Sequence, residues 1–229
     1  MSEISTGKLY GVGVGPGDPE LITLKAVKIL ERVHVVMVPS GKGESIAFDI
    51  AKPYIKGEVL KLEFPMTRER DILESVWDEN AKKIKKLLVD GRDVAFITLG
   101  DPMIYSTYIY VIERLEGFKI ETIPGVTSFS AAASKLKMPI ARGNRPFAVV
   151  PAEDEKTMKK ILDDFESVVL MKVSGNYDRT VDLLKAGGFK AGLVIRGGHE
   201  DEEVTFDLEK YRRKKLDYLS LIIGRKMGG

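Results

Sequence analysis

Three short loops carry the residues whose types and spacing could do chemistry. The first, Tyr10 to Glu20, reads YGVGVGPGDPE and holds four alternating glycines. The second contains Gly100, Asp101 and Pro102, and the third reads IPGVTSFSAAAS from residue 123. Glycine is used where backbone must bend sharply or where something must approach it closely. The loops therefore mark a place where either a ligand or another stretch of backbone comes near.

The first loop fits neither of the two common phosphate-binding patterns. A dinucleotide fingerprint needs a third glycine, but that position is Pro16 when counted from Gly11 and Asp18 when counted from Gly13. A Walker loop needs Gly-Lys-Ser/Thr, whereas Gly17 is followed by Asp18, whose charge would repel phosphate. The loop suits a neutral or cationic ligand better. The alternative is a strand-to-helix turn that packs tightly against neighbouring backbone.

The elements that must position these loops are short apolar runs, and each loop directly follows one. Amphipathic segments separate most runs of the first half, a pattern that favours a largely parallel α/β sheet. The runs of the second half lie closer together and predict a second, partly antiparallel sheet. Pro124 and Gly125 interrupt both periodicities, so we expect two α/β domains of about five strands each, residues 1–123 and 124–229. The runs are residues 9–14, 33–38, 58–64, 93–99 and 119–123, then 147–151, 167–173, 191–196, 203–208 and 218–223.

The loops should lie together, because open α/β sheets bind ligands at the carboxyl ends of their strands. After the first loop we expect a helix that Asp18 caps and Pro19 begins. Asp101 and Ser128 could likewise be simple helix caps. The helix after Pro19 would bury an apolar stripe of Ile22, Ala26, Ile29 and Val33.

Composition excludes several classes of protein. The 229 residues include no Cys and only two histidines, so we expect no disulfides and no resident metal. A net charge of +2, from 36 basic and 34 acidic residues, speaks against nucleic acid as partner. No apolar run reaches about 18 residues and the N-terminus lacks a signal-peptide pattern, which predicts a cytoplasmic protein without membrane spans. We expect His34 to be structural and His199 to lie at the surface.

The motifs VGVGPGDPELITLKA, GDPMIYSTYIYVIERL and IPGVTSFSAAASKLKMPIA, in that order and spacing, resemble the tetrapyrrole methylase family, which uses S-adenosylmethionine. The resemblance runs from Leu9 to Ile223. Within the family, VIRGGHEDEEV and the second and third loops are most similar to the precorrin-2 carbon-20 methyltransferases of cobalamin biosynthesis. The resemblance implies a homodimer whose active site lies between two α/β domains, with S-adenosylhomocysteine as a product.

The same resemblance implies which residues hold the cofactor, largely through backbone groups. Met171 is also a common core residue, and Gly197 could simply be a turn residue. No general base can be named, since a weak base, water or spontaneous tautomerisation could remove the proton. The implied cofactor positions are Gly13, Gly15, Pro16, Gly100, Asp101, Ile104, Thr127, Ser128, Met171 and Gly197.

The implied substrate is a flat macrocycle with acetate and propionate arms, and such carboxylates favour arginine partners. Arg142 and Arg145 follow the third loop and either bind these arms or lie on the solvated surface. Of the three tyrosines 105, 108 and 110, one or two must face the core, and we take Tyr105 as a substrate contact. Arg68 and Arg70 are weaker candidates, and Lys135 and Lys137 are expected at the surface. The resemblance leaves open whether the macrocycle already carries cobalt.

Three rival interpretations remain open. The chain could be another methylase of the same family, acting on uroporphyrinogen III or a later corrin intermediate. It could resemble the branch that includes diphthine synthase, which methylates a modified histidine of a translation factor, or the branch that methylates a ribosomal RNA ribose. It could also be an adenosine-binding module without catalysis.

Overall fold

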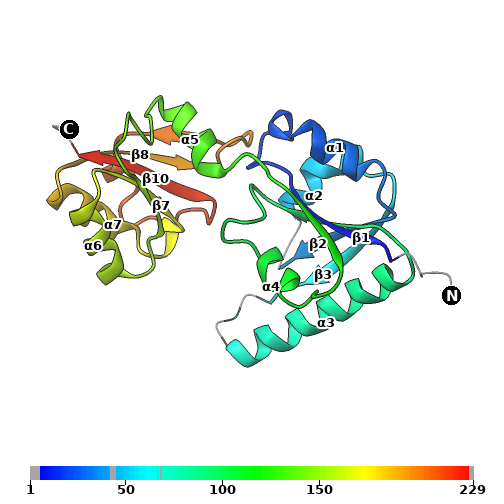
Figure 1. Cartoon of the computed structure of the whole chain (residues 1–229). Helices are drawn as coiled ribbons and strands as arrows, with labels where there is room; N and C mark the ends of the chain where they lie inside the picture. The colour runs from blue at the N-terminus through cyan, green and yellow to red at the C-terminus, as the bar shows by residue number, and fades with distance from the viewer. Residues whose placement is uncertain (1–5, 42–44, 66, 68, 227–229) are drawn as a thin grey trace. The chain divides into compact units, whose positions relative to one another are not determined.

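The computed structural model describes residues 6–41, 45–65, 67 and 69–226. The chain divides into two compact units, with the division between Thr127 and Ser128. Each unit contains one five-stranded sheet with helices packed on it (Figure 1). The fold class predicted from the sequence, two α/β domains of about five strands each, is confirmed.

All four strand pairings in the sheet of the first unit are parallel, as the alternation of apolar runs and helices predicts. Each of the five predicted runs overlaps a strand. The spatial order is β3-β2-β4-β1-β5. The strands are β1 Lys8–Gly13, β2 Val35–Ser40, β3 Glu58–Glu63, β4 Val94–Thr98 and β5 Lys119–Ile123.

Helices cover both faces of this sheet, so its three inner strands, β1, β2 and β4, are buried on both sides. Along β2, Val36 and Val38 pack into a core cluster with Ala26 of α1 and Ile50 of α2. The alternate residues Val35 and Met37 enter a second cluster, beneath α3 and α4. Figure 1 shows the long helix α3 on that second face. The helices are α1 Leu24–Leu30, α2 Ile46–Ala51, α3 Arg70–Val89 and α4 Tyr108–Ile112, and short 3-10 turns span Pro19–Leu21 and Lys52–Tyr54.

The parallel register brings the ends of three strands to one edge of the sheet. Gly13, the last residue of β1, pairs with Thr98 at the end of β4, and Val12 pairs with Ile123 at the end of β5. The loops that follow β1, β4 and β5 therefore leave the sheet side by side, as expected for the carboxyl ends of parallel strands.

The predicted helix beginning at Pro19 is wrong in detail. Residues Pro19–Leu21 form only a 3-10 turn, which Asp18 caps by accepting a hydrogen bond from the Glu20 amide at 2.9 Å. Ile22 is then extended, and α1 begins at Leu24, where the Thr23 hydroxyl accepts from the Ala26 amide at 3.1 Å. The second cap explains the break, because an N-cap residue has non-helical dihedrals.

The sheet of the second unit is mixed, as predicted. Its spatial order is β6-β7-β10-β8-β9, in which β6 and β7 are parallel and the other pairs antiparallel. One core cluster lies beneath α6 and α7 and another beneath α5. The strands are β6 Ala148–Pro151, β7 Ser167–Met171, β8 Phe189–Ile195, β9 Glu203–Thr205 and β10 Ser220–Lys226. The α-helices are α5 Ser128–Leu136, α6 Glu155–Asp164 and α7 Tyr177–Ala186, with 3-10 turns at Val173–Gly175 and Leu208–Tyr211.

A carboxylate on β5 ties three elements of the first unit together. Glu121 pairs with Lys8 of β1 and, at 2.6 Å, with Lys25 of α1. Hydrogen bonds from Lys25 and Lys8 lower the pKa of Glu121 from 4.5 to about 2. Because the folded state holds this carboxylate ionised, Glu121 contributes to stability above its unfolded pKa.

We expect this contribution to disappear as the pH falls from about 4.5 towards 2, because the folded protein binds the Glu121 proton later than the unfolded chain does. The Glu121→Gln variant should melt at a lower temperature than the wild type near neutral pH. At the acid end of the range the two melting temperatures should be nearly equal. Melting temperatures of both proteins across this range test the prediction. A constant difference at every pH would contradict it.

Candidate functional site

The three loops predicted to converge do so within the first unit. Gly15 and Gly100 form an isolated antiparallel bridge, in which the Gly100 amide donates to the Gly15 carbonyl at 2.7 Å and the reverse bond is 3.4 Å. The Val14 amide donates to the Thr98 carbonyl at 3.0 Å, which extends the pairing of β1 with β4 by one residue. The first and second loops are thus joined by their main chains.

Glycine is required where the first and second loops meet the third. A Cβ built on Gly13 would lie 2.6 Å from the Gly100 carbonyl oxygen and 2.6 Å from the Gly125 nitrogen. A Cβ on Gly125 would lie 2.1 Å from the same Gly100 oxygen. Both distances are far inside van der Waals contact, so these glycines allow backbone to pack on backbone. The alternative of tight backbone packing therefore holds at Gly13.

Gly15 and Gly100 are required for a different reason: both have positive φ, at +86° and +72°, which favours glycine. A Cβ on Gly15 would also press on the Leu21 carbonyl oxygen at 3.2 Å. Beside Gly100 the nearest atom to such a Cβ is the Val126 oxygen, at 3.9 Å. The space over Gly100 is thus the open part of this glycine cluster, and Pro16 is buried beside Gly15.

Asp101 fastens the second loop to the third. One of its carboxylate oxygens accepts from the Met103 amide within a turn at 2.9 Å, and the other accepts from the Gly125 amide at 3.0 Å. The helix-cap interpretation of Asp101 is wrong, because the next helix, α4, begins only at Tyr108. Ile104 follows in the same loop and is half-buried, and its amide donates to the Asp101 carbonyl at 3.3 Å.

A buried pair of hydroxyls beneath these loops was not anticipated from the sequence. Thr98 Oγ1 and Ser106 Oγ lie 3.2 Å apart, and Ser106 also accepts from the Tyr108 amide at 3.1 Å. Buried hydroxyls need such partners, and here they hold the start of α4 against the end of β4. The only sequence signal is that Ser106 stands two residues before a helix of apolar residues.

The three tyrosines near the second loop have different environments. Tyr108 is fully buried; its hydroxyl lies 2.9 Å from Thr122 Oγ1, and burial raises its pKa. Tyr110 stacks on Trp77 with ring centroids 4.1 Å apart. Tyr105 is 48% exposed and has a φ of +50°, rare for a residue with a side chain. Of the three, Tyr105 is the most exposed, and its role as a substrate contact stays a prediction.

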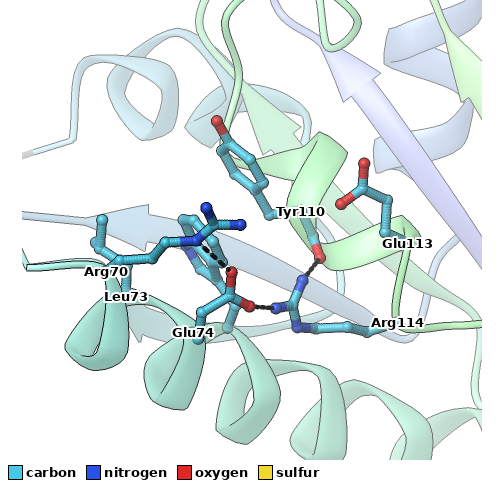
Figure 2. A pocket seen from close by; sticks show the side chains of 7 residues that line it. Arg70, Leu73, Glu74, Tyr110, Glu113 and Arg114 are labelled. Atoms are coloured by element: carbon cyan, nitrogen blue, oxygen red, sulfur yellow. Dashed lines mark hydrogen bonds and ion pairs between the residues drawn. The ribbon is translucent and has the colours of Figure 1, made fainter.

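Arg70 lies in a surface hollow of about 440 Å³ between α3 and α4 (Figure 2). Its guanidinium is 3.5 Å from Glu74, which also pairs with Arg114. Arg114 in addition pairs with Asp78 at 2.6 Å and donates to the Tyr110 carbonyl at 2.8 Å, so its charge is already satisfied. The other candidate from this region, Arg68, lies outside the described residues.

The two cofactor positions expected in the second half lie at one edge of the second sheet. Met171 is the last residue of β7 and pairs with Leu221 of β10. On the other side of β10, Ser220 pairs with Ile195, which stands two residues before Gly197. Lys172 and Arg196 adjoin these positions with φ of +56° and +48°. Left-handed residues of this kind cluster at functional sites. Ser128 begins α5 and is half-buried, like Thr127 before it.

The arginines and lysines after the third loop lie at the surface. Arg142 and Arg145 are exposed, and Arg145 pairs with Glu166. Lys135 and Lys137 are exposed, as expected, and Lys135 reaches Glu202 at 3.0 Å.

The two histidines differ in their surroundings. His34 accepts a hydrogen bond from the Asp93 amide at 3.0 Å, a structural contact. The expectation of a surface His199 is wrong, because it is half-buried and its Nε2 is buried without a hydrogen-bond partner among the described residues.

The described residues contain neither a membrane-spanning helix nor a cluster of metal-binding side chains. None of their helices combines the length and the apolar character needed to pass through a lipid bilayer. Their histidine, aspartate and glutamate side chains nowhere gather in threes in a way that could hold a metal ion.

The fold is thus an α/β fold whose candidate ligand site lies at three glycine-bearing loops, residues 13–18, 100–104 and 124–128. These loops contain two carboxylates, Asp18 and Asp101, and no arginine or lysine. The family model described as Tetrapyrrole (Corrin/Porphyrin) Methylases matches residues 8–210, and the chain belongs to this family. The resemblance predicted from the three motifs is thereby confirmed.

Named relatives match over nearly the whole chain. A protein of Methanocaldococcus jannaschii named a probable cobalt-precorrin-2 C(20)-methyltransferase is 37% identical, covering 94% of this chain and 95% of its own. A precorrin-2 C(20)-methyltransferase of Sinorhizobium is 33% identical, covering 97% of each. The solved structure of uroporphyrin-III C-methyltransferase from Thermus thermophilus, complexed with S-adenyl homocysteine, has a TM-score of 0.69 at 22% identity and covers 96% of this chain and 97% of that one.

Gly13→Ala should destabilise the first unit, because the new methyl would overlap backbone atoms that cannot rotate away. Overpacking of this kind costs about 1–3 kcal/mol in the free energy of unfolding. Gly175→Ala is the matched control, since nothing lies within 4 Å of its Cβ position. Urea denaturation of both variants measures the difference. Equal stability of Gly13→Ala and wild type would show that the three loops are not in contact.

Proposed function

We propose that this protein transfers a methyl group from S-adenosylmethionine to carbon 20 of precorrin-2 or cobalt-precorrin-2, in cobalamin biosynthesis. One observation carries the proposal: relatives named for this reaction match almost end to end at 33–37% identity. A homodimer in the cytoplasm remains part of the proposal. The choice between the metal-free and the cobalt-containing substrate stays open, because relatives named for each match this chain.

The three loops suit S-adenosylmethionine as their ligand. Asp18 and Asp101 are the only ionised side chains in residues 13–18, 100–104 and 124–128, so the local charge favours a sulfonium over a phosphate. Both Asp101 oxygens are already used by loop amides, which leaves backbone and the open face of Gly100 to meet the ligand. A protein of the same fold has been solved with the demethylated product of this cofactor.

We assign the cofactor to the positions named from the family motifs. In the first unit Gly15 pairs with Gly100, Gly13 packs on the Gly100 carbonyl, and Asp101 holds the second loop to the third. The left-handed residues beside Met171 and Gly197 support the assignment in the second unit. The full set is Gly13, Gly15, Pro16, Gly100, Asp101, Ile104, Thr127, Ser128, Met171 and Gly197.

The reaction demands little of side chains. S-adenosylmethionine supplies a methyl group already activated by its sulfonium, and carbon 20 of the reduced macrocycle supplies the electron pair. The carbon–sulfur bond breaks as the new carbon–carbon bond forms, and the proton on carbon 20 then leaves. The chain's part is to hold donor and acceptor in line, for which rigid loops are well suited. Tyr105, half exposed next to Ile104, is placed as a substrate contact and not as a base.

The purified protein should bind S-adenosylhomocysteine, which calorimetry measures. It should also convert precorrin-2 or cobalt-precorrin-2 to a product one methyl group heavier, which mass spectrometry detects. A panel with uroporphyrinogen III, a later corrin intermediate, a diphthine precursor and ribosomal RNA separates the rival interpretations. Turnover of one of these alone would replace the proposed substrate. Binding without any turnover would favour the non-catalytic module.

Replacing both Arg142 and Arg145 with Gln should raise the KM for the tetrapyrrole by about tenfold if they bind its carboxylate arms, because such contacts contribute equally in ground and transition states. The affinity for S-adenosylhomocysteine should not change. The defect should shrink at high salt, since exposed charges are screened over about 8 Å at physiological ionic strength. Arg92→Gln, which breaks a pair with Glu58 at 2.6 Å, is the control. An unchanged KM at low salt would place both arginines on the ordinary surface.

A further inference from the structure

The turn between β8 and β9 begins with a residue in the left-handed region of backbone space, which is uncommon for a residue with a side chain. Arg196 and Gly198 have φ of +48° and +85°, on either side of Gly197. The Arg196 side chain donates to Asp201 at 2.7 Å, across the turn. The Arg196 amide also donates to the Leu219 carbonyl at 2.8 Å, which joins the turn to the start of β10.

Glu202 closes the turn from the other side. One of its carboxylate oxygens accepts from the Gly198 amide at 2.7 Å. The other lies 3.0 Å from the Lys135 ammonium of α5. The Glu202 side chain is only 17% exposed, so both contacts are partly shielded from water. Charged hydrogen bonds are stronger in such a shielded environment than in water. One carboxylate therefore joins the turn to a helix.

That helix is itself seated firmly on the second sheet. A Cβ on Gly192 of β8 would lie 2.4 Å from the Leu136 side chain of α5, so the helix packs directly on bare backbone. Lys135 lies seven residues after Ser128, the first residue of α5, which corresponds to about 10 Å along the helix axis. A shift of the helix at Lys135 is thus a shift of Ser128 as well.

We infer that Glu202 is a positioning residue: its carboxylate couples α5 to the turn at Gly197 and so fixes, relative to each other, two of the proposed S-adenosylmethionine contacts, Ser128 and Gly197. The inference rests on the proposed function. Glu202 touches no reacting atom in this role; it acts through the Gly198 amide and through Lys135.

The test measures the affinity for S-adenosylhomocysteine by calorimetry, well below the melting temperature. Glu202→Gln keeps the shape of the side chain but loses its charge, so we expect affinity to fall about tenfold, as for loss of a charged hydrogen-bond partner. Lys135→Met should weaken binding in the same direction, and Lys135→Arg should restore it. Should Glu202→Gln fail to fold, the two Lys135 variants still decide the question.

Glu155→Gln is the matched control. Glu155 pairs with Lys159 at 2.8 Å and Arg179 at 2.7 Å on α6 and α7, away from the turn, so its loss should lower the melting temperature without changing affinity. In turnover, Glu202→Gln should raise the KM for S-adenosylmethionine while kcat at saturation stays within about twofold of wild type. The tetrapyrrole KM should not move.

The outcomes separate this inference from the proposed function. Wild-type affinity in Glu202→Gln and Lys135→Met, with only a lower melting temperature, would overturn the positioning role and leave the proposed function intact. A wild-type protein that binds no S-adenosylhomocysteine would overturn both.

Discussion

The contact of three bare backbone segments at the edge of the first sheet is the constraint on which the rest of the structure depends. Gly13 and Gly125 lie so close to each other and to the Gly100 carbonyl that no side chain fits between them. Parallel pairing sets the ends of β1, β4 and β5 in register, and Asp101 then fastens the third loop through the Gly125 amide. The result is a surface of main-chain groups that has little freedom to move.

Such a surface fits a reaction whose reactivity resides in the bound molecules. An enzyme that needs an activated nucleophile must hold charged side chains in perturbed environments, whereas methyl transfer from a sulfonium chiefly needs alignment. The loop residues here match the second requirement: Asp101 is fully engaged with amides, and the buried hydroxyls of Thr98 and Ser106 satisfy each other. The side chains thus hold the loops in place and leave main-chain groups for the proposed ligand.

The sequence predicted the fold well because apolar runs and their spacing reflect burial directly. Each strand in the described part of the chain overlaps a predicted apolar run, and the parallel and mixed character of the two sheets was expected. The break at Thr23 was missed, because Asp18 and Thr23 are both good caps and only their competition places the start of α1. The sequence indicated that position 13 needs glycine, but not whether a ligand or another backbone segment lies against it. The answer depends on residues about 90 and 110 positions away, which only the parallel sheet brings close to Gly13.

The two units hold their shares of the proposed cofactor site in different ways. In the first unit, glycine contacts and amide hydrogen bonds involve no ion pair, so their geometry is insensitive to salt. In the second, the turn at Gly197 depends on carboxylates that face Arg196 and Lys135, and the hydrogen bond from Arg196 lowers the pKa of Asp201. Ion pairs are screened by salt and lost when the acid is protonated. We therefore expect salt to disturb the turn at Gly197 more than the glycine contacts of the first unit.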